Sequence, residues 1–230
     1  MENNATITGI TKLDEILDGE LKKGALYLIA SQPNYGKTSF AIQTAASIAE
    51  SEKKVFFCSL GMIKEQIKDR LAKQGKENVS IVIEDRSGIT PCEIKEMLIA
   101  QNAEVAIIDY LGLIYIDGKF ENRRQEITEI TRQLKVIAKE LQIPIICLSQ
   151  LSRRAMFVRG KGHIPRPKLP EDLRVFGSIE QDCDVIIFLH REEDATDSNV
   201  EIIVARNRYG QCGTIEATFD KERLLFTEKE

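Results

Sequence analysis

The chain has 230 residues, of which 43% are hydrophobic and 30% charged, and its formal net charge is −4. This length and apolar content suit one sizeable core, so we expect a single domain over residues 1–230. No secretory signal begins the chain and no run of about 18 apolar residues predicts a membrane span. We therefore expect a soluble, cytoplasmic protein with no membrane association. The net negative charge excludes a broadly basic surface, so nucleic-acid binding of any kind must be local.

The cysteines are spaced singly along the chain, as Cys58, Cys92, Cys147, Cys183 and Cys212. There is no C-x-x-C pair and there are only two histidines, so the spacing is not that of a metal site. Four of the five lie in apolar or strand-like surroundings. We expect buried thiols and not a set of disulfides.

Taken in chain order, apolar runs of strand length alternate with amphipathic stretches of helix length. The expected strands are 25–30, 54–59, 80–83, 104–109, 143–149 and 184–190. The expected helices are 37–49, 62–74, 91–101 and 126–141. This alternation predicts a doubly wound α/β domain, with a mostly parallel, twisted sheet flanked by helices.

Two local signals sharpen this prediction. Thr90, Pro91 and Glu93 offer an N-cap, a proline at the first helical position and a glutamate three residues after the cap. Near the C-terminus, residues 199–206 and 213–220 are rich in β-forming residues and flank a polar turn. They predict a C-terminal β-hairpin.

The most informative segment joins the first expected strand to the first expected helix. It consists of Ser31, Gln32, Pro33, Asn34, Tyr35, Gly36, Lys37, Thr38 and Ser39. Such a loop can wrap a triphosphate with its backbone N–H groups, while the helix dipole favours the negative charge. The P-loop pattern G-x-x-x-x-G-K-[ST] is complete here except for Ser31 at its first position. We expect this segment to bind a nucleoside triphosphate, with Lys37 on the β- and γ-phosphates and the Thr38 hydroxyl on Mg²⁺.

Two further apolar runs end in polar side chains that suit a nucleotide site. One ends at Asp109 and the other at Gln150. Ligands of open parallel sheets gather at the carboxyl ends of the strands. We expect Asp109 to hold Mg²⁺ with Thr38, directly or through water, and Gln150 to hydrogen-bond the γ-phosphate or the attacking water. Either run alone would be an ordinary strand end.

Several motifs then follow one another in a specific order. Besides the P-loop they are 8–14, 57–62, 108–111, 148–153, 177–182 and 205–213. Over about residues 8–226 the chain resembles the RecA-type motor domain of the DnaB-type replicative DNA helicases. The resemblance implies a RecA-like P-loop fold and a hexameric ring that uses ATP hydrolysis to translocate along single-stranded DNA in replication. It also implies a helicase loader or primase as a partner. We expect the family's N-terminal collar domain to be missing, since the chain begins almost at the motor.

One departure from this resemblance concerns catalysis. Where the family places a glutamate that polarises the attacking water, this chain has Gly61. Such a group is typically worth about 10²–10⁴-fold in rate, so its loss predicts slow turnover of bound ATP. Glu65, about one helical turn further on, is the candidate substitute.

The predicted hairpin carries the group that the resemblance expects to act between subunits. Arg208 matches the position of the family's arginine finger, which reaches the ATP of the neighbouring subunit and can be worth about 10³–10⁵-fold. Arg206, two residues earlier, is expected on the same face of the strand. Without the resemblance, these arginines would indicate only solubilising side chains on an exposed hairpin.

Basic residues concentrate in one segment, 152–170, which contains no acidic residue. They are Arg153, Arg154, Arg159, Lys161, Arg166 and Lys168. Such a track suits a phosphate backbone, and the resemblance places it on a loop that lines the central channel of the ring. A second loop, 117–124, has mixed charges and is a weaker candidate.

Two alternatives stay open on the sequence alone. The chain fits a related RecA-like ATPase that acts in recombination or in helicase loading. It also fits a hydrolysis-deficient protein that binds DNA or forms a ring, in which ATP only sets the conformation.

Overall fold

The computed structural model describes residues 6–151, 179–191 and 198–229. The strands are β1 (Leu26–Ser31), β2 (Val55–Ser59), β3 (Ile81–Glu84), β4 (Val105–Asp109), β5 (Ile145–Gln150), β6 (Val185–His190), β7 (Asn199–Asn207), β8 (Gly213–Asp220) and β9 (Leu225–Glu228). The helices are α1 (Thr11–Ile16), α2 (Lys37–Glu50), α3 (Lys64–Lys73), α4 (Pro91–Ala100), the short 3-10 helix η1 (Leu111–Leu113), α5 (Arg123–Leu141) and α7 (Ile179–Asp182).

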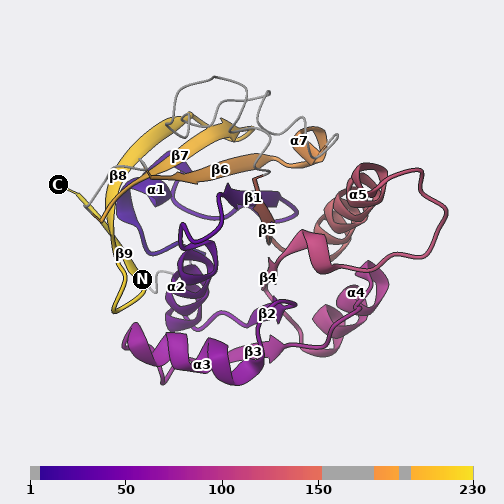
Figure 1. Cartoon of the computed structure of the whole chain (residues 1–230), viewed down its shortest axis with the longest axis horizontal. Coiled ribbons are helices and arrows are strands. Elements are labelled where there is room, and N and C mark those ends of the chain that lie inside the picture. The colour runs from indigo at the N-terminus through magenta and orange to yellow at the C-terminus, as the bar shows by residue number, and fades with distance from the viewer. Residues whose placement is uncertain (1–5, 152–178, 192–197, 230) are drawn as a thin grey trace.

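All of these strands belong to one nine-stranded sheet, in the order β3-β2-β4-β5-β1-β6-β7-β8-β9. The six strands from β3 to β6 in this order run parallel, and β7, β8 and β9 continue the sheet in antiparallel fashion. The predicted mostly parallel sheet with a C-terminal hairpin is therefore confirmed. Figure 1 shows the sheet between two groups of helices, with β7, β8 and β9 curling away at one side.

Helices cover both faces of the parallel part, which explains why its central strands are continuous apolar runs in the sequence. In β1 every residue is buried, and alternate side chains enter different cores. Tyr27 and Ile29 pack with residues of α1, α2 and α3, whereas Leu26 and Leu28 pack with residues of α4, α5 and α7. Figure 1 shows the same division, with α2 and α3 on one side of the sheet and α4 and α5 on the other.

Capping side chains fix where two of the helices begin. At α4 the predicted capping box is present, since Thr90 Oγ1 accepts from Glu93 N at 3.3 Å and Glu93 Oε2 accepts from Thr90 N at 2.9 Å. Helix α5 begins at Arg123, earlier than the expected start at 126, because Asn122 is its N-cap and accepts from Gln125 N at 3.1 Å. The capping residue lies in the segment 117–124 that the sequence predicts to be a polar loop.

The prediction that the thiols are buried is wrong for two of the five cysteines. Cys58, Cys147 and Cys183 are buried in strands or beside them, but Cys92 and Cys212 are exposed. Cys92 lies in the first turn of α4 and is not among the residues that this helix buries in the core. Cys212 lies in the turn between β7 and β8.

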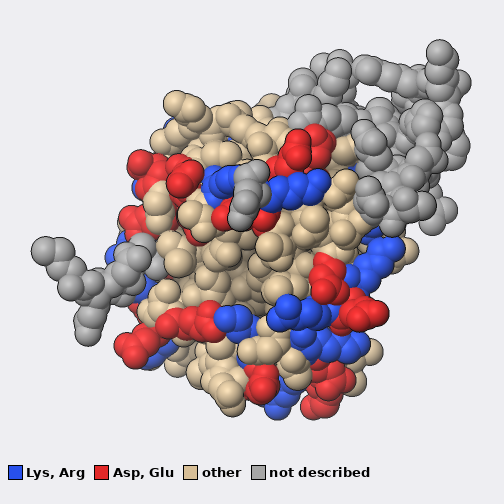
Figure 2. Space-filling view, turned by 90° about the vertical axis from the view of Figure 1, so that its left-hand side faces the viewer, with Lys and Arg blue, Asp and Glu red and all other residues tan. Residues whose placement is uncertain are grey.

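Charges of both signs share the face of the molecule seen in Figure 2. Lysine, arginine, aspartate and glutamate side chains alternate there around a band of uncharged residues, and no broad field of one sign is visible. Within the described ranges, none of the helices combines the length and the apolar character needed to cross a bilayer.

Candidate functional site

The loop between β1 and α2 has the conformation of an anion-binding loop. Asn34 and Gly36 both take positive φ angles, 65° and 86°. Gly36 is the N-cap of α2 and supplies no side-chain cap. The first N–H groups of an α-helix have no partner within the helix, so here they face the position where a phosphate group would lie. The local backbone therefore fits the triphosphate that the sequence predicts.

The half-buried ammonium of Lys37 lies over this loop. Its Nζ atom donates to Ser31 O and Ser31 Oγ at 3.2 Å each and to Gln32 O at 3.3 Å. Burial lowers the pKa of Lys37 to about 8, although the charge of Asp109 opposes the shift. None of the three acceptors carries a charge, so an anionic ligand would be a better partner for this ammonium than the loop itself. The departure from glycine at Ser31 is accommodated, since its hydroxyl also donates to Gln32 O at 2.8 Å.

Thr38 and Asp109, the predicted magnesium ligands, lie together. Asp109 is the last residue of β4 and is only 7% exposed. Burial raises the pKa of its carboxyl, while a hydrogen bond with the Thr38 side chain and the charges of Lys37 and Arg70 oppose that shift. A carboxylate beside a hydroxyl is a hard oxygen donor set of the kind that Mg²⁺ prefers. The residues present therefore fit this ion.

Gln150 ends β5 at the same edge of the sheet. It lies opposite Ser31 in the parallel pairing of β1 with β5, and its side chain is exposed. Leu151 extends this pairing by donating its N–H to Ser31 O at 2.9 Å. The neighbouring strand thus brings the amide of Gln150 next to the first residue of the P-loop.

Gly61 lies two residues after the carboxyl end of β2, the strand that neighbours the one ending at Asp109. Ser59 is opposite Asp109 in register, and Leu60 N donates to Asp109 O at 2.7 Å. A Cβ atom on Gly61 would lie 3.8 Å from Leu113 Cδ1 and 3.9 Å from Tyr110 Cε1, which is ordinary contact. A Cβ atom at this position therefore meets no close contact. Glu65 lies exposed in the first turn of α3, and its role as a substitute stays a prediction.

A second basic residue, Arg70 of α3, lies near this site, and sequence patterns did not indicate it. Its Nη1 atom donates to Ser39 Oγ at 3.2 Å, and Ser39 is 1% exposed in the first turn of α2. Gln74 donates to the carbonyl of the same serine at 3.0 Å. Helix α3 thus contacts the P-loop helix through Arg70 and Gln74. Nothing in the sequence distinguishes Arg70 from the other basic residues of this helix, such as Lys68.

The two hairpin arginines lie at the amino ends of the parallel strands, whereas the P-loop of their own chain lies at the carboxyl ends. We call these two sides the amino edge and the P-loop edge of the sheet. Arg208 donates from Nη1 to Asp184 Oδ1 at 3.1 Å and from Nη2 to Gln181 O at 2.7 Å. Arg206 donates to the carbonyl of Glu180. Asp184 precedes β6 at the amino end of the parallel strands, whereas the P-loop follows their carboxyl ends. The structure therefore does not bring these arginines to the nucleotide site of the same chain.

The six basic residues predicted to contact DNA lie outside the described residues. They are Arg153, Arg154, Arg159, Lys161, Arg166 and Lys168. The described residues end at Leu151 and resume at Ile179, where α7 begins.

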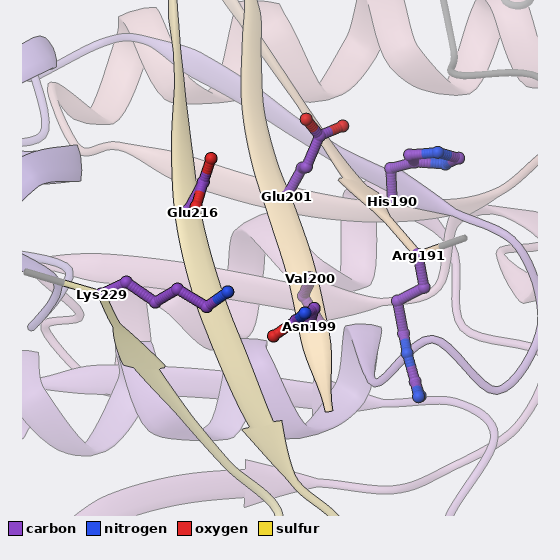
Figure 3. Close-up of a pocket in the computed structure, with 7 residues that line it drawn as sticks. All are labelled: His190, Arg191, Asn199, Val200, Glu201, Glu216 and Lys229. Atoms are coloured by element: carbon purple, nitrogen blue, oxygen red, sulfur yellow. The ribbon is translucent and has the colours of Figure 1, made fainter. Parts of the chain in front are cut away.

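A polar pocket of about 210 Å³, which no sequence motif predicts, opens beside the P-loop. Its lining residues are His190, Arg191, Asn199, Val200, Glu201, Glu216 and Lys229 (Figure 3). In the antiparallel pairing of β6, β7 and β8, His190 is opposite Glu201 and Glu201 opposite Glu216. The hydroxyl of Tyr35 donates to Arg191 O at 3.2 Å, which joins the P-loop to the rim of this pocket.

Comparison with known proteins decides the family. The model of the DnaB-like helicase C terminal domain matches residues 6–78 and 72–228. The chain belongs to this family. A curated relative, the replicative DNA helicase DnaC of Bacillus subtilis (strain 168), is 35% identical over an alignment 261 positions long, gaps included. The alignment covers 97% of this chain and 56% of that protein. The chain thus spans little more than half the length of the curated relatives that it matches.

Solved structures agree with the fold. One of them, described as an ATPase domain, superposes with a TM-score of 0.89 at 30% identity, over 98% of this chain and 92% of that one. A DnaB-like replicative helicase, described with its interactions with primase, also gives a TM-score of 0.89 at 30% identity and matches over 98% of this chain and 64% of that one. The predicted RecA-like architecture of the DnaB type is confirmed.

Proposed function

We propose that this chain is the ATP-driven motor of a DnaB-type replicative helicase, which couples hydrolysis to movement along single-stranded DNA. The observation that carries the proposal is a cluster at the carboxyl ends of the parallel strands, where the N-terminus of the P-loop helix, the half-buried Lys37 and the Thr38–Asp109 pair converge. Membership of the DnaB-like family supports it. It favours a helicase motor over a recombination or loading ATPase.

Each residue of the cluster has a role in this proposal. The P-loop amides and Lys37 bind and orient the phosphates, and Lys37 compensates the charge that builds up on the transferring group. Thr38 and Asp109 would hold Mg²⁺, which would offset the negative charge of the phosphates. Gln150 hydrogen-bonds the γ-phosphate or the attacking water from the neighbouring strand.

The rate of hydrolysis depends on a carboxylate that Gly61 does not provide. We expect slow turnover unless Glu65 approaches the attacking water once ATP is bound. The second candidate function, a nucleotide-gated ring or DNA-binding protein, rests on this one residue. It differs from the motor only in whether hydrolysis takes place.

The position of Arg208 supports an assembly in which one subunit completes the site of the next. Because it lies at the edge opposite its own P-loop, its guanidinium can reach a nucleotide only in another subunit. A ring closes when each subunit presents this edge to the P-loop edge of its neighbour. We propose a hexamer on the family's pattern, with Arg208 as the finger and Arg206 beside it.

Single-stranded DNA is the proposed track, and the basic residues of segment 152–170 are its proposed contacts. Backbone contacts of this kind are strongly salt-dependent. A related DnaB-like helicase is described with its interactions with primase. A primase or a helicase loader is therefore the proposed protein partner.

Steady-state ATP hydrolysis tests the proposal, measured with and without single-stranded DNA from dilute to concentrated protein. A motor with a finger in trans gives turnover that rises with both DNA and protein concentration. Lys37→Ala is the control and should abolish it. Tight ATP binding with no turnover under any condition would overturn the motor and leave the nucleotide-gated protein. Hydrolysis without unwinding of a forked duplex would indicate a loader instead.

A further inference from the structure

A buried carboxylate, Asp184, lies at the centre of the contacts that hold Arg208. The Asp184 side chain is only 3% exposed. Its Oδ1 atom accepts from Arg208 Nη1 at 3.1 Å, and its Oδ2 atom accepts from Leu26 N at 2.8 Å and from Lys135 Nζ at 2.5 Å. Its main chain is also paired, since Asp184 N donates to Leu26 O at 2.9 Å and Arg208 N donates to Asp184 O at 3.0 Å.

Lys135 fixes this carboxylate from the side of α5. Its side chain is 19% exposed, and its Nζ atom donates to Gly24 O at 2.8 Å as well as to Asp184. A buried carboxylate is held firmly when charged and backbone donors occupy both of its oxygens. Removing one member of such a group leaves the remaining charge unpaired.

The guanidinium of Arg208 is consequently held at two points while part of it stays open to solvent. Asp184 accepts from one terminal nitrogen and Gln181 O from the other, and the side chain is 43% exposed. A free arginine side chain samples many rotamers, and ordering it costs free energy at the moment of use. These two acceptors impose that order before any partner arrives.

We propose that Asp184, supported by Lys135, is a positioning residue that pre-orients Arg208 for the nucleotide of the neighbouring subunit. The inference rests on the proposed function, in which Arg208 acts in trans. Asp184 itself touches no reacting group. Because both its amide and its carboxylate bond to Leu26, it lies at one end of β1, and the P-loop follows the other end. Each subunit thus links its own nucleotide strand to the group that it offers to its neighbour.

The first test is Asp184→Asn, which keeps the size of the side chain and removes its charge. The DNA-stimulated kcat should fall about 10–100-fold, because a small misplacement of a catalytic group has an effect of that order. Binding of a fluorescent ATP analogue to the variant's own P-loop should not change. A merely structural role would lower both together.

Glu104→Gln is the matched control. Glu104 directly precedes β4 at the same amino edge and accepts from Lys53 Nζ and Lys54 N at 3.0 Å each, without an arginine. It should keep the full kcat. If Asp184→Asn folds poorly, the double variant Asp184→Asn with Lys135→Met removes the unpaired ammonium and still lacks the charged acceptor for Arg208. It should show the same loss of kcat.

Mixing experiments isolate the finger from the nucleotide site. Arg208→Ala subunits keep a P-loop but lack a finger, whereas Lys37→Ala subunits keep a finger but lack a working P-loop. Mixtures of the two should recover turnover. The double variant Lys37→Ala with Asp184→Asn should fail to restore it, and Lys37→Ala with Glu104→Gln should succeed.

The outcomes separate this inference from the proposed function. Equal restoration by the Asp184→Asn donor would overturn the positioning role and leave the finger intact. Full turnover by Arg208→Ala alone, or no turnover by the unaltered chain, would overturn the proposed trans catalysis and this inference with it.

Discussion

Gly36 of the P-loop and Phe226 of the last strand lie in direct contact. A Cβ atom on Gly36 would lie 2.8 Å from Phe226 Cζ, closer than real Cβ contacts allow. Phe226 in turn packs edge-on against Phe40, at 5.3 Å between ring centroids, and against Phe219 at 4.5 Å. Gln43 fixes its backbone, since the side-chain amide accepts from Phe226 N at 2.8 Å and donates to Phe226 O at 2.9 Å. The phosphate-binding loop thus packs on a cluster of aromatic rings, Phe40, Phe219 and Phe226, which we call the aromatic floor.

Gly36→Ala tests this contact. We expect the free energy of unfolding to fall by about 2–4 kcal/mol, because the methyl group both strains a positive φ and overpacks the aromatic floor. ATP affinity should fall with it. Chemical denaturation and binding of a fluorescent ATP analogue measure the two effects. Gly19→Ala is the control, since Gly19 has a φ of 85° and a Cβ atom added there would meet nothing within 4 Å. An equal loss of unfolding free energy in both variants would show that the aromatic rings move aside at no cost and that only the positive φ matters.

Gly61→Glu should raise the rate of ATP hydrolysis by about 10²–10⁴-fold, because it supplies the carboxylate that the resemblance predicts at this position. The contacts at 3.8 Å and 3.9 Å leave the backbone undisturbed. Single-turnover hydrolysis at saturating ATP measures the step. Gly61→Gln has the same shape without the charge and should stay slow. An unchanged rate in Gly61→Glu would show that the carboxylate is not what limits turnover.

Glu65→Gln addresses the turnover that the unaltered chain retains. If Glu65 replaces the absent glutamate, the substitution should lower the residual rate by at least about tenfold while ATP binding stays the same. The same assay measures it. Glu77, an exposed glutamate beyond the end of α3, supplies the control Glu77→Gln. An unchanged residual rate in Glu65→Gln would show that Glu65 is not the substitute for the missing carboxylate.

ATP affinity should depend on pH through Lys37. Burial lowers its pKa to about 8, so the ammonium is present below that pH and is lost above it. ATP binding favours the ammonium, so the dissociation constant should be flat below about pH 8 and rise by up to tenfold per pH unit above it. Stability has the opposite trend, because the buried charge is unfavourable below about pH 8 and this cost disappears as the pH rises towards 10.5.

Titration with a fluorescent ATP analogue between about pH 6.5 and about pH 9.5 measures the effect. Lys37→Arg keeps its charge over this range, so its dissociation constant should not rise with pH. A rise of the same size in both proteins would mean that another group titrates.

Binding of single-stranded DNA should be strongly dependent on salt. Replacing Arg153 and Arg154 by alanine should weaken binding uniformly across sequences and reduce the slope of log affinity against log salt by about 1.4, or about 0.7 for each arginine that pairs with a phosphate. Fluorescence anisotropy of a labelled oligonucleotide at several salt concentrations measures the slope. The pair Lys76→Ala and Lys95→Ala removes the same charge from surfaces at or beside helices. An equal change in slope there would contradict a localised DNA site.

The parts of the fold that sequence patterns predict are those with local causes. β1 and β4 are buried on both faces, so their apolar runs are visible without knowledge of their partners. The capping box of Thr90 and Glu93 spans three residues, and the P-loop is a contiguous motif. The meeting of Thr38 with Asp109 follows from one general rule, that ligands gather at the carboxyl ends of parallel strands.

The rest depends on contacts between distant parts of the chain. Strand β9 is only four residues long and pairs with β8, and its outer side is bonded at Phe226 by Gln43, which is 183 positions away. The contact of Arg70 with Ser39 depends on how α3 packs against α2, which helical periodicity alone does not fix. The network around Asp184 likewise joins segments that no spacing rule connects.

The hydrogen bonds of Gln43 also bear on whether another chain can pair with the outer strand β9. β9 is an outer strand, and an unpaired edge invites another chain to add a strand. At Phe226 the glutamine side chain occupies the N–H and the C=O that such a strand would use. The other outer strand, β3, is four residues long and ends at Glu84, which pairs with Arg86 at 3.1 Å. One border of the sheet is thus blocked at Phe226 by a side chain of α2, and the other is a short strand that ends in a charged pair.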